Sequence, residues 1–309
     1  MGIQHSTFKI QHNSNKTVII IAGPTAVGKT QLAIQLAKDL STEIISADSR
    51  QCYKEMKIGV ARPAEEALKE VKHHFIASHS IHEEVNAATF EKYALDATKQ
   101  LFQKHDVIIM AGGTGLYIRA FCEGMDEIPT VPEDIRSQIV LKYKQQGLQW
   151  LQNEVQARDP DFFTAGEIKN PQRLMRALEV SEATGQSILT FRKGKKTSRG
   201  FNIIKVGLEL PKNELHHNIN QRVEKMIEDD LVSEVKTLLP YKHLSALQTP
   251  GYKEIVEYLE DKIALQDAID MIKKNTRQYA KRQQTWFRKD KEIKWFAPKE
   301  IISIRNFLK

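Results

Sequence analysis

Short, continuous runs of apolar residues, many of them β-branched, recur along the chain. The runs are Thr17–Ala22, Glu43–Asp48, Asp106–Gly112 and Ile203–Leu210. Runs of this length without alternation are typical of strands that are buried on both faces of a parallel sheet. Between them, apolar residues recur four apart, as at Leu32, Leu36 and Leu40, which predicts helices packed on that sheet. The alternation of the two patterns predicts an α/β fold.

The alternation is interrupted after Pro129 by a helix-rich stretch that contains many Lys and Arg residues. Because the sheet pattern resumes at Ile203, an inserted helical subdomain is the simplest explanation. From Asn213 onward the sequence predicts helices only. The predicted organisation is a disordered N-terminal arm (1–16), a core in two segments (17–128 and 200–296), an inserted helical subdomain (129–199) and a C-terminal tail (297–309).

Composition narrows the class of protein. The 309-residue chain has no run of roughly 18 apolar residues and its start is polar, so neither a membrane span nor a secretion signal is predicted. Its two cysteines, Cys52 and Cys122, do not have the paired spacing of a disulfide framework or a zinc site. We therefore expect a cytoplasmic protein in a reducing compartment.

The net charge of +7 is distributed unevenly. Residues 133–199 carry 12 basic and 8 acidic side chains, and residues 262–309 carry 13 and 5. Basic residues gathered on one surface release counterions when they meet phosphates, so this segregation favours a nucleic-acid partner. A solvated charged face is the alternative, because a pI near 9.1 also occurs in proteins that bind no nucleic acid.

A phosphate-binding motif follows the first predicted strand. The pattern G-x-x-x-x-G-K-[ST] is matched by Gly23, Pro24, Thr25, Ala26, Val27, Gly28, Lys29 and Thr30. Its backbone N–H groups and the helix N-terminus favour a phosphate, Lys29 adds a full positive charge, and the Thr30 hydroxyl is a ligand for Mg²⁺. The predicted core is therefore a P-loop NTPase-like sheet that binds a diphosphate.

The carboxylates near this loop are not those of an ordinary NTPase. A Walker-B Asp is expected at the end of a later core strand, but the run Asp106–Gly112 has its only acid at the opposite end. Asp48 does lie at the carboxyl end of a predicted strand, where open α/β sheets build their sites. It is placed to bind a metal or to accept a proton, and the alternative is an ordinary turn residue.

Six blocks occur in order between about residue 17 and residue 296. They are Gly23–Thr30, Ile45-Ser-Ala-Asp-Ser49, Gly112-Gly-Thr-Gly-Leu-Tyr117, Gln172-Arg-Leu-Met-Arg-Ala-Leu-Glu-Val180, Gly251-Tyr-Lys253 and Lys281-Arg-Gln-Gln-Thr-Trp286. With these blocks the sequence resembles the tRNA dimethylallyltransferases, also called tRNA isopentenyltransferases. One segment departs from the family pattern, since Gln248-Thr249-Pro250 precedes Gly251, which puts the family's RNA contact there in question.

The resemblance implies a Mg²⁺-dependent reaction. The P-loop then binds dimethylallyl diphosphate, and the prenyl group passes to N6 of the adenosine immediately 3′ of the anticodon. Asp48 matches the family's general base, and Lys29 and Thr30 act on the leaving diphosphate. Arg136 and Thr114 match family positions that contact substrate, and Arg136 is an additional phosphate-binding residue. The alternatives are that Arg136 is a solvated residue at the start of a helix and that Thr114 is an ordinary turn residue. The resemblance also suggests a monomer.

The resemblance further implies contacts with the tRNA anticodon stem-loop. The residues implied are Asp48, Ser49, Arg50, Gln51, Gln172, Arg173, Leu174, Met175 and Arg176, together with the C-terminal cations Arg277, Lys281, Arg282 and Arg288. The C-terminal helix gives some independent support, because Lys274, Arg277, Lys281 and Arg288 share one stripe of a predicted helix. Ordinary solvated cations are the alternative.

Two other classes of function stay open at this point. A small-molecule kinase or NTPase is what the P-loop alone predicts, and a non-catalytic RNA-binding protein is what the basic segments alone predict. The first is disfavoured by the lack of a Walker-B carboxylate at the predicted position, and the second by intact Lys29, Thr30 and Asp48.

Overall fold

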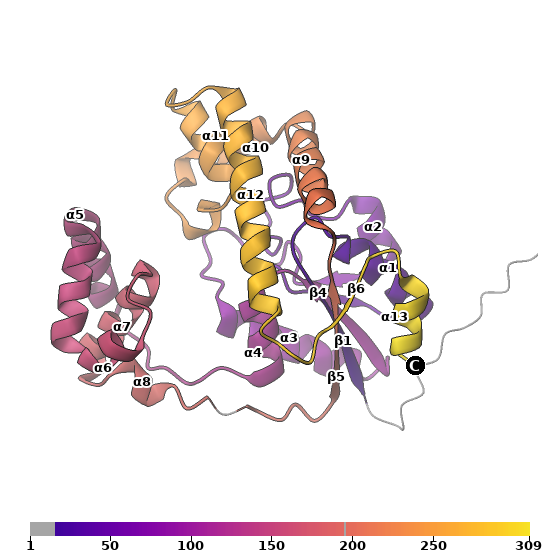
Figure 1. The fold of residues 1–309 in the computed structure, drawn as a ribbon, viewed down its shortest axis with the longest axis horizontal. Coiled ribbons are helices and arrows are strands. Elements are labelled where there is room, and N and C mark those ends of the chain that lie inside the picture. Colours follow the sequence, from indigo (N-terminus) through magenta and orange to yellow (C-terminus); the bar gives the residue numbers. More distant parts are fainter. Residues whose placement is uncertain (1–15, 195) are drawn as a thin grey trace, which may run out of the picture. The chain divides into compact units, whose positions relative to one another are not determined.

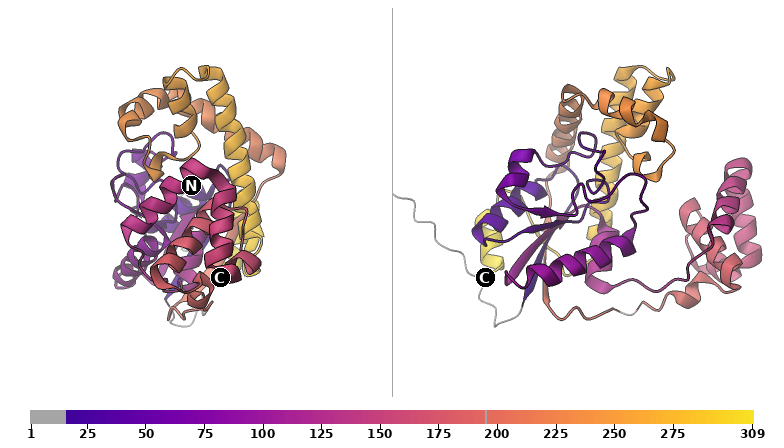
Figure 2. Two further views of the ribbon diagram at one scale, coloured as in Figure 1. Left: turned by 90° about the vertical axis from the view of Figure 1, so that its left-hand side faces the viewer. Right: turned by 180° about the vertical axis from the view of Figure 1, so that it is seen from behind.

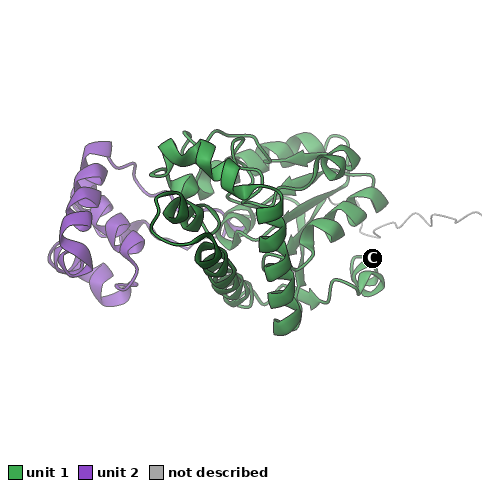
Figure 3. Ribbon diagram, turned by 90° about the horizontal axis from the view of Figure 1, so that it is seen from above, with its two compact units in different colours: residues 1–122, 198–309 green, residues 123–197 purple. Residues whose placement is uncertain are grey.

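The computed structural model describes residues 16–194 and 196–309. The predicted disordered arm lies outside them, apart from its last residue. The chain divides into a larger unit, formed by the segments before residue 123 and after residue 197, and a smaller unit, residues 123–197 (Figure 3). The bounds predicted for the insertion were 129–199. The two units are described separately below.

The larger unit contains one six-stranded sheet in which every neighbouring pair is parallel. The strand order is β3-β2-β4-β1-β5-β6. The strands are β1 (Thr17–Ala22), β2 (Ile44–Ser46), β3 (His73–His74), β4 (Val107–Gly112), β5 (Asn202–Leu208) and β6 (Lys294–Phe296). The predicted parallel α/β fold is confirmed.

One prediction about the sheet is wrong. The sequence predicted helices only after Asn213, but β6 joins the edge of the sheet beside β5. This strand has three residues and begins with an exposed Lys294, so it has neither the length nor the apolar run that marks the central strands. Its pairing with Val206–Leu208 rather than its own sequence fixes its conformation.

Helices cover both faces of the sheet, as Figures 1 and 2 show. In the larger unit they are α1 (Lys29–Asp39), α2 (Glu65–Glu70), α3 (Ala87–Leu101), α4 (Gly115–Glu123), α9 (Lys212–Glu228), α10 (Leu231–Leu238), α11 (Tyr252–Leu259), α12 (Leu265–Phe287) and α13 (Ile301–Phe307), with the short 3₁₀ turns η1 (Leu239–Tyr241) and η2 (Ser245–Leu247). Helix α13 lies in the segment predicted as a C-terminal tail, and its Ile304 is buried.

Alternate residues of β1 face two separate hydrophobic clusters. Val18 and Ile20 pack in the cluster that contains the buried side chains of α3, whereas Ile19 and Ile21 pack with Leu36 of α1. These four side chains of β1 are fully buried. A central strand with apolar side chains on both faces requires helices on both faces, which explains the unbroken apolar run in the sequence.

The smaller unit is an all-helical body with its own core. It consists of α5 (Glu133–Arg158), α6 (Pro160–Ala165), α7 (Pro171–Thr184) and α8 (Ile188–Phe191). Gly147 has φ of 77° and interrupts α5 with a kink. Leu151 and Val155 of α5 pack against Leu174 and Leu178 of α7, and these four side chains form the centre of the core.

Candidate active site

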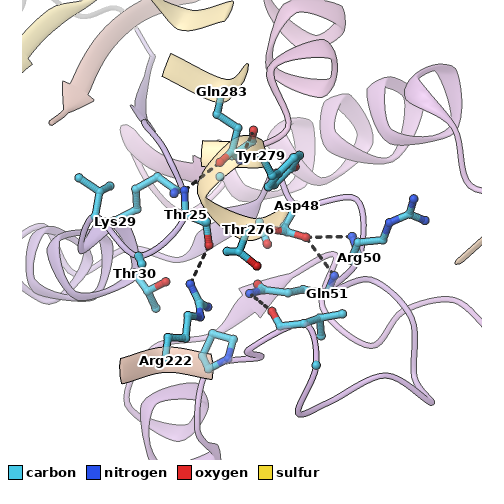
Figure 4. Close-up of a pocket in the computed structure, with 18 of the residues that line it drawn as sticks. Thr25, Lys29, Thr30, Asp48, Arg50, Gln51, Arg222, Thr276, Tyr279 and Gln283 are labelled. Carbon is cyan, nitrogen blue, oxygen red and sulfur yellow. Dashed lines mark hydrogen bonds between the residues drawn. The ribbon is translucent and has the colours of Figure 1, made fainter. Parts of the chain in front are cut away.

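The predicted phosphate loop joins β1 to α1 at the carboxyl end of the sheet. Gly28 immediately precedes α1 and has φ of 100°, a conformation that side-chain-bearing residues rarely adopt. This turn brings Lys29 back over the loop, where its Nζ donates to the Pro24 carbonyl at 2.6 Å. Thr30 follows in the first turn of α1, with its side chain exposed. All three residues line a cavity of about 820 Å³ (Figure 4).

A second cation, Arg222 of α9, lies against the loop. Its Nη1 donates to the Thr25 hydroxyl at 2.8 Å, and its Nη2 donates to the Ala61 carbonyl at 3.4 Å. Burial together with the positive charge of Arg222 lowers the pKa of Lys29 to about 7, and Asp48 opposes this change. The cavity therefore presents two cations at close quarters, which strongly favours an anionic ligand.

Arg222 is not among the site residues predicted from the sequence. It is one cation among several on an amphipathic helix, and nothing in its local sequence distinguishes it from a solvated Arg. Only the packing of α9 against α12 and the approach of α9 to the loop identify it.

Asp48 lies two residues after β2 on the same cavity. Its Oδ1 accepts hydrogen bonds from the backbone N–H groups of Arg50 and Gln51, at 2.9 and 3.2 Å. Asp48 is therefore a turn residue, as one alternative stated, but only one of its oxygens serves the turn. Within residues 16–194 and 196–309, no protein donor is hydrogen-bonded to Oδ2. That oxygen is available to a bound molecule.

Thr114 fixes the segment that follows Asp48. Its Oγ1 accepts a hydrogen bond from the Ser49 backbone N–H at 3.0 Å and lies 3.3 Å from the Ser49 hydroxyl. Its own backbone N–H donates to the carbonyl of Ala47 at 3.1 Å. Thr114 thus joins the loop after β4 to the loop after β2.

Helix α12 also lines the cavity, with Tyr279 and Gln283 among its contributing residues (Figure 4). Gln283 is buried; its Nε2 donates to the Gly113 carbonyl and its Oε1 accepts from the Thr25 N–H, both at 2.8 Å. One side chain therefore connects the phosphate loop to the loop after β4. Gln283 lies inside a block quoted for the family resemblance, but the sequence did not distinguish it from its neighbours.

We expect Gln283→Met to lower the free energy of unfolding by about 1–3 kcal/mol, because the buried Thr25 N–H and Gly113 carbonyl lose their partner. The urea midpoint of unfolding measures the change. Gln278→Met is the control, since Gln278 is exposed on the same helix and should give a midpoint close to that of the unmodified chain. Equal midpoints for the two variants would contradict the role of Gln283.

The other predicted residues of the larger unit have different surroundings. Arg50 donates to the carbonyl of Ser245, and Gln51 donates to the carbonyls of Val60 and Ala61 at 3.2 and 3.0 Å. Arg50 and Gln51 both line the cavity. The segment after Asp48 is thus held by protein contacts on both sides of the site.

The cations of α12 and Arg288, the residue that follows this helix, do not form one uniform surface. Arg277 donates to Asn220 of α9 at 2.8 Å, and Arg288 forms an ion pair with Glu209 at 2.5 Å. Lys281 and Arg282 are exposed, and Arg282 also lines the cavity beside Tyr279. The stripe predicted to face phosphates is therefore partly occupied by contacts within the protein.

Arg136 and the segment Gln172–Arg176 belong to the smaller unit. Arg136 is exposed on α5, and Gln172 and Arg173 are exposed on α7. Leu174 and Met175 of the same predicted segment have their side chains buried in the core of this unit. The helical repeat places these two apolar residues on the inner side of α7, so only their polar neighbours reach the surface.

Across residues 16–194 and 196–309, no three His, Cys, Asp or Glu side chains are grouped as a ready-made metal site. His74 of β3 is hydrogen-bonded to Glu43 at 2.6 Å. No helix in the same ranges has the length and apolar character needed to cross a membrane.

Known proteins resemble this chain over most of its length. A family model described as IPP transferase matches residues 51–290. The chain is 42% identical to "tRNA dimethylallyltransferase 1" of Bacteroides thetaiotaomicron, over 95% of each chain, and 47% identical to the tRNA dimethylallyltransferase of Christiangramia forsetii, over 90% of this chain and 92% of the relative. The chain belongs to the IPP transferase family.

A solved structure of the family has the same fold. The full-length tRNA isopentenylpyrophosphate transferase from Bacillus halodurans is 34% identical to the chain, superimposes with a TM-score of 0.69 and matches over 95% of both chains. Membership of the IPP transferase family disfavours the kinase and the non-catalytic RNA-binding alternatives. The strand end that would carry a Walker-B carboxylate has Ala111, Gly112 and Gly113 instead.

Proposed function

We propose that the chain transfers the dimethylallyl group of dimethylallyl diphosphate to N6 of the adenosine immediately 3′ of the anticodon in tRNA. The products are N6-isopentenyladenosine and diphosphate. The observation that carries the proposal is that Asp48, which uses only its Oδ1 in the turn, lines the same cavity as Lys29 and Arg222. A group that accepts protons and a pair of cations for a departing anion thus share one site.

The phosphate loop acts on the leaving group in this proposal. As the bond between the prenyl C1 and the diphosphate oxygen breaks, negative charge accumulates on the diphosphate. The loop N–H groups, Lys29 and Arg222 are already in place to stabilise that charge, so little reorganisation is needed in the transition state. The diphosphate also raises the lowered pKa of Lys29 again, which keeps the ammonium group charged while it is bound.

Asp48 is the base for the acceptor. An exocyclic amine is a poor nucleophile, and it becomes a better one when its proton is removed as the N6–C1 bond forms. The Oδ1 bonds to the Arg50 and Gln51 N–H groups orient the carboxylate, and Oδ2 takes the proton from N6. The balance is complete: one C–N bond forms, one C–O bond breaks, and the proton passes to Asp48.

The residues around the loop fit a magnesium ion held jointly with the diphosphate. Mg²⁺ is usually bound by one or two protein oxygens together with phosphate oxygens and water, and it rarely needs a cage of protein ligands. The exposed Thr30 hydroxyl on the cavity wall supplies such an oxygen. When bound, the ion would neutralise part of the charge on the departing diphosphate.

The acceptor is reached by extrusion of the target base from its stack. Bases of single-stranded loops can be splayed out at a cost of a few kcal/mol, which makes an anticodon loop a suitable substrate. Exposed cations near the cavity, Lys281 and Arg282, and exposed polar residues of the smaller unit, Arg136, Gln172 and Arg173, are the proposed RNA contacts. A monomeric, cytosolic enzyme stays a prediction.

We expect Lys274→Ala combined with Lys281→Ala to weaken tRNA binding and to flatten its salt dependence. Both side chains are exposed on α12, and each lost phosphate contact should reduce the slope of log K against log salt by about 0.7–0.9. Filter binding of unmodified tRNA over a range of KCl concentrations measures the slope. Lys69→Ala with Lys104→Ala, on distant exposed surfaces, is the matched control, and an unchanged slope for the α12 pair would remove α12 from the RNA surface.

The decisive test of the proposed function supplies dimethylallyl diphosphate labelled in the prenyl group together with unmodified tRNA and Mg²⁺. A parallel reaction contains ATP in place of the prenyl donor. Label in tRNA, located on the adenosine 3′ of the anticodon after nuclease digestion, is the expected result. ATP hydrolysis without transfer of label would overturn the proposal.

A further inference from the structure

The segment that follows Asp48 contains an irregular loop, residues 57–61, on the wall of the active-site cavity. Gly59 and Val60 line the cavity. The loop has no regular secondary structure, and Ala61 adopts φ of 45°, a left-handed conformation that is costly for a residue with a side chain. Such a conformation persists only when surrounding contacts impose it.

The loop carries the carbonyl groups that hold two side chains of the site. The Ala61 carbonyl accepts from Arg222 at 3.4 Å and from Gln51 at 3.0 Å. The opposite side of the Arg222 guanidinium donates to the Thr25 hydroxyl at 2.8 Å. The direction in which Arg222 presents its charge therefore depends on where the loop holds the Ala61 carbonyl.

A carboxylate from a distant helix holds this loop. Glu234 of α10 accepts hydrogen bonds from three successive backbone N–H groups, those of Lys57, Ile58 and Gly59, at 3.0, 2.7 and 3.1 Å. Hydrogen bonds to an ionised acceptor are about twice as strong as neutral ones, and successive N–H groups form a natural anion site. Glu234 thus fixes most of the loop with one side chain.

Tyr252 holds Glu234 in turn. Its hydroxyl donates to Glu234 at 2.6 Å, and burial together with Glu234 raises its pKa, so it remains a protonated donor. The Tyr252 ring is fully buried against Gly59, where any Cβ atom would come within 2.5 Å of the ring. This contact explains why glycine is needed at position 59.

The Gly251-Tyr252 pair thereby acquires a role that the sequence did not reveal. The pair belongs to one of the blocks that resemble the family. The divergent residues 248–250 just before it put the family's RNA contact at this segment in question. In the structure the Tyr252 side chain is fully buried and points its hydroxyl to Glu234, so it does not present a surface to RNA.

A compensating charge, Arg62, interacts with Glu234. Arg62 donates to the carbonyls of Tyr53, Lys54 and Met56, and Glu234 opposes the lowering of the Arg62 pKa that burial causes. The half-buried carboxylate of Glu234 is therefore balanced by hydrogen bonds and by a nearby cation, as a charge removed from water requires.

We propose that Glu234, braced by Tyr252, is a positioning residue for the diphosphate site, and that it acts through loop 57–61 and the Ala61 carbonyl on Arg222. The inference rests on the proposed function, because it assigns Arg222 to the diphosphate. Glu234 itself does not touch the substrate: it determines where a residue that does is held.

The test uses Glu234→Gln in the full chain, which removes the charge with little change in shape. We expect the amides of Lys57, Ile58 and Gly59 to exchange faster with deuterium, and the affinity for inorganic diphosphate to fall about 10-fold, within the range of coupling for residues that share one network. Isothermal titration with diphosphate and Mg²⁺ measures the affinity. Glu228→Gln, at the exposed end of α9, should change neither quantity.

A double-mutant cycle separates positioning from general destabilisation. In an Arg222→Met background, Glu234→Gln should lower the diphosphate affinity further by no more than about 3-fold, because its effect passes through Arg222. Equal losses of diphosphate affinity in both backgrounds would overturn the inference. So would unchanged amide exchange in Glu234→Gln, or faster amide exchange with an unchanged diphosphate affinity.

Tyr252→Phe provides a second variant if Glu234→Gln does not fold. It removes one hydrogen bond to Glu234 and keeps the ring against Gly59, so we expect a smaller affinity loss that again disappears in the Arg222→Met background. Failure of the proposed function gives a different result: the unmodified chain would bind diphosphate and respond to these variants, but would transfer no prenyl group to tRNA.

Discussion

Replacement of Asp48 by Asn is expected to lower the rate of prenyl transfer by about 10²–10⁴-fold, the usual contribution of a positioned acid-base group. The amide oxygen of Asn still accepts from the Arg50 and Gln51 N–H groups, so the turn after β2 is kept. What is lost is the carboxylate oxygen that receives the N6 proton. Single-turnover transfer to an anticodon stem-loop, with enzyme in excess, reports this step directly.

The choice of Asn makes this experiment sharper than truncation to Ala, because Ala would also release the two backbone N–H groups. Filter binding of tRNA should give nearly the same affinity for Asp48→Asn as for the unmodified chain. Asp106→Asn is the matched control: Asp106 is exposed at the opposite end of β4 and pairs with Lys16, so its loss should leave transfer unchanged. Transfer by Asp48→Asn at a normal rate would exclude Asp48 as the base.

Arg222→Met is expected to have the second-largest effect. Loss of one preorganised charge at a developing anion typically costs about 10²–10³-fold in rate, and Arg222 lies with Lys29 at the phosphate loop on the cavity proposed to bind the diphosphate. Methionine preserves much of the aliphatic packing of the Arg side chain but donates no hydrogen bond. We expect both the single-turnover rate and the affinity for inorganic diphosphate to fall.

Lys212→Met serves as the control for Arg222→Met, because it removes a cation from the same helix at an exposed position. The tRNA affinity of both variants should stay near that of the unmodified chain, since Arg222 is predicted to act on the prenyl donor. A normal diphosphate affinity in Arg222→Met would show that the P-loop and Lys29 suffice, and it would also remove the basis of the Glu234 inference.

Arg222 and Glu234 are connected to the candidate site in different ways. Arg222 touches the loop that binds the ligand, whereas Glu234 is connected to the site through three backbone N–H groups and one carbonyl. Regions whose local conformation is strained need support of this kind, and the left-handed Ala61 marks the strained point. The helices after β5 therefore position the ligand site as well as covering the sheet.

Several features were determined by the sequence alone. The unbroken apolar run of β1 requires cover on both faces, so a parallel sheet between helices follows from local chemistry. The Gly23–Thr30 spacing determines a phosphate loop, because its glycines and the following helix are sufficient to direct N–H groups at an anion. Asp48 could be found because the carboxyl ends of parallel strands share one edge of the sheet.

Other features were decided only by tertiary structure. Arg222, Gln283 and Glu234 reach the site from helices far along the chain from the loops that they contact, and no local pattern encodes such meetings. The cations of α12 and the adjacent Arg288 look alike in sequence, yet only the tertiary structure gives Arg277 and Arg288 partners within the protein, Asn220 and Glu209. Short-range periodicity fixes which face of a helix is buried; which distant group that face meets depends on how the whole chain packs.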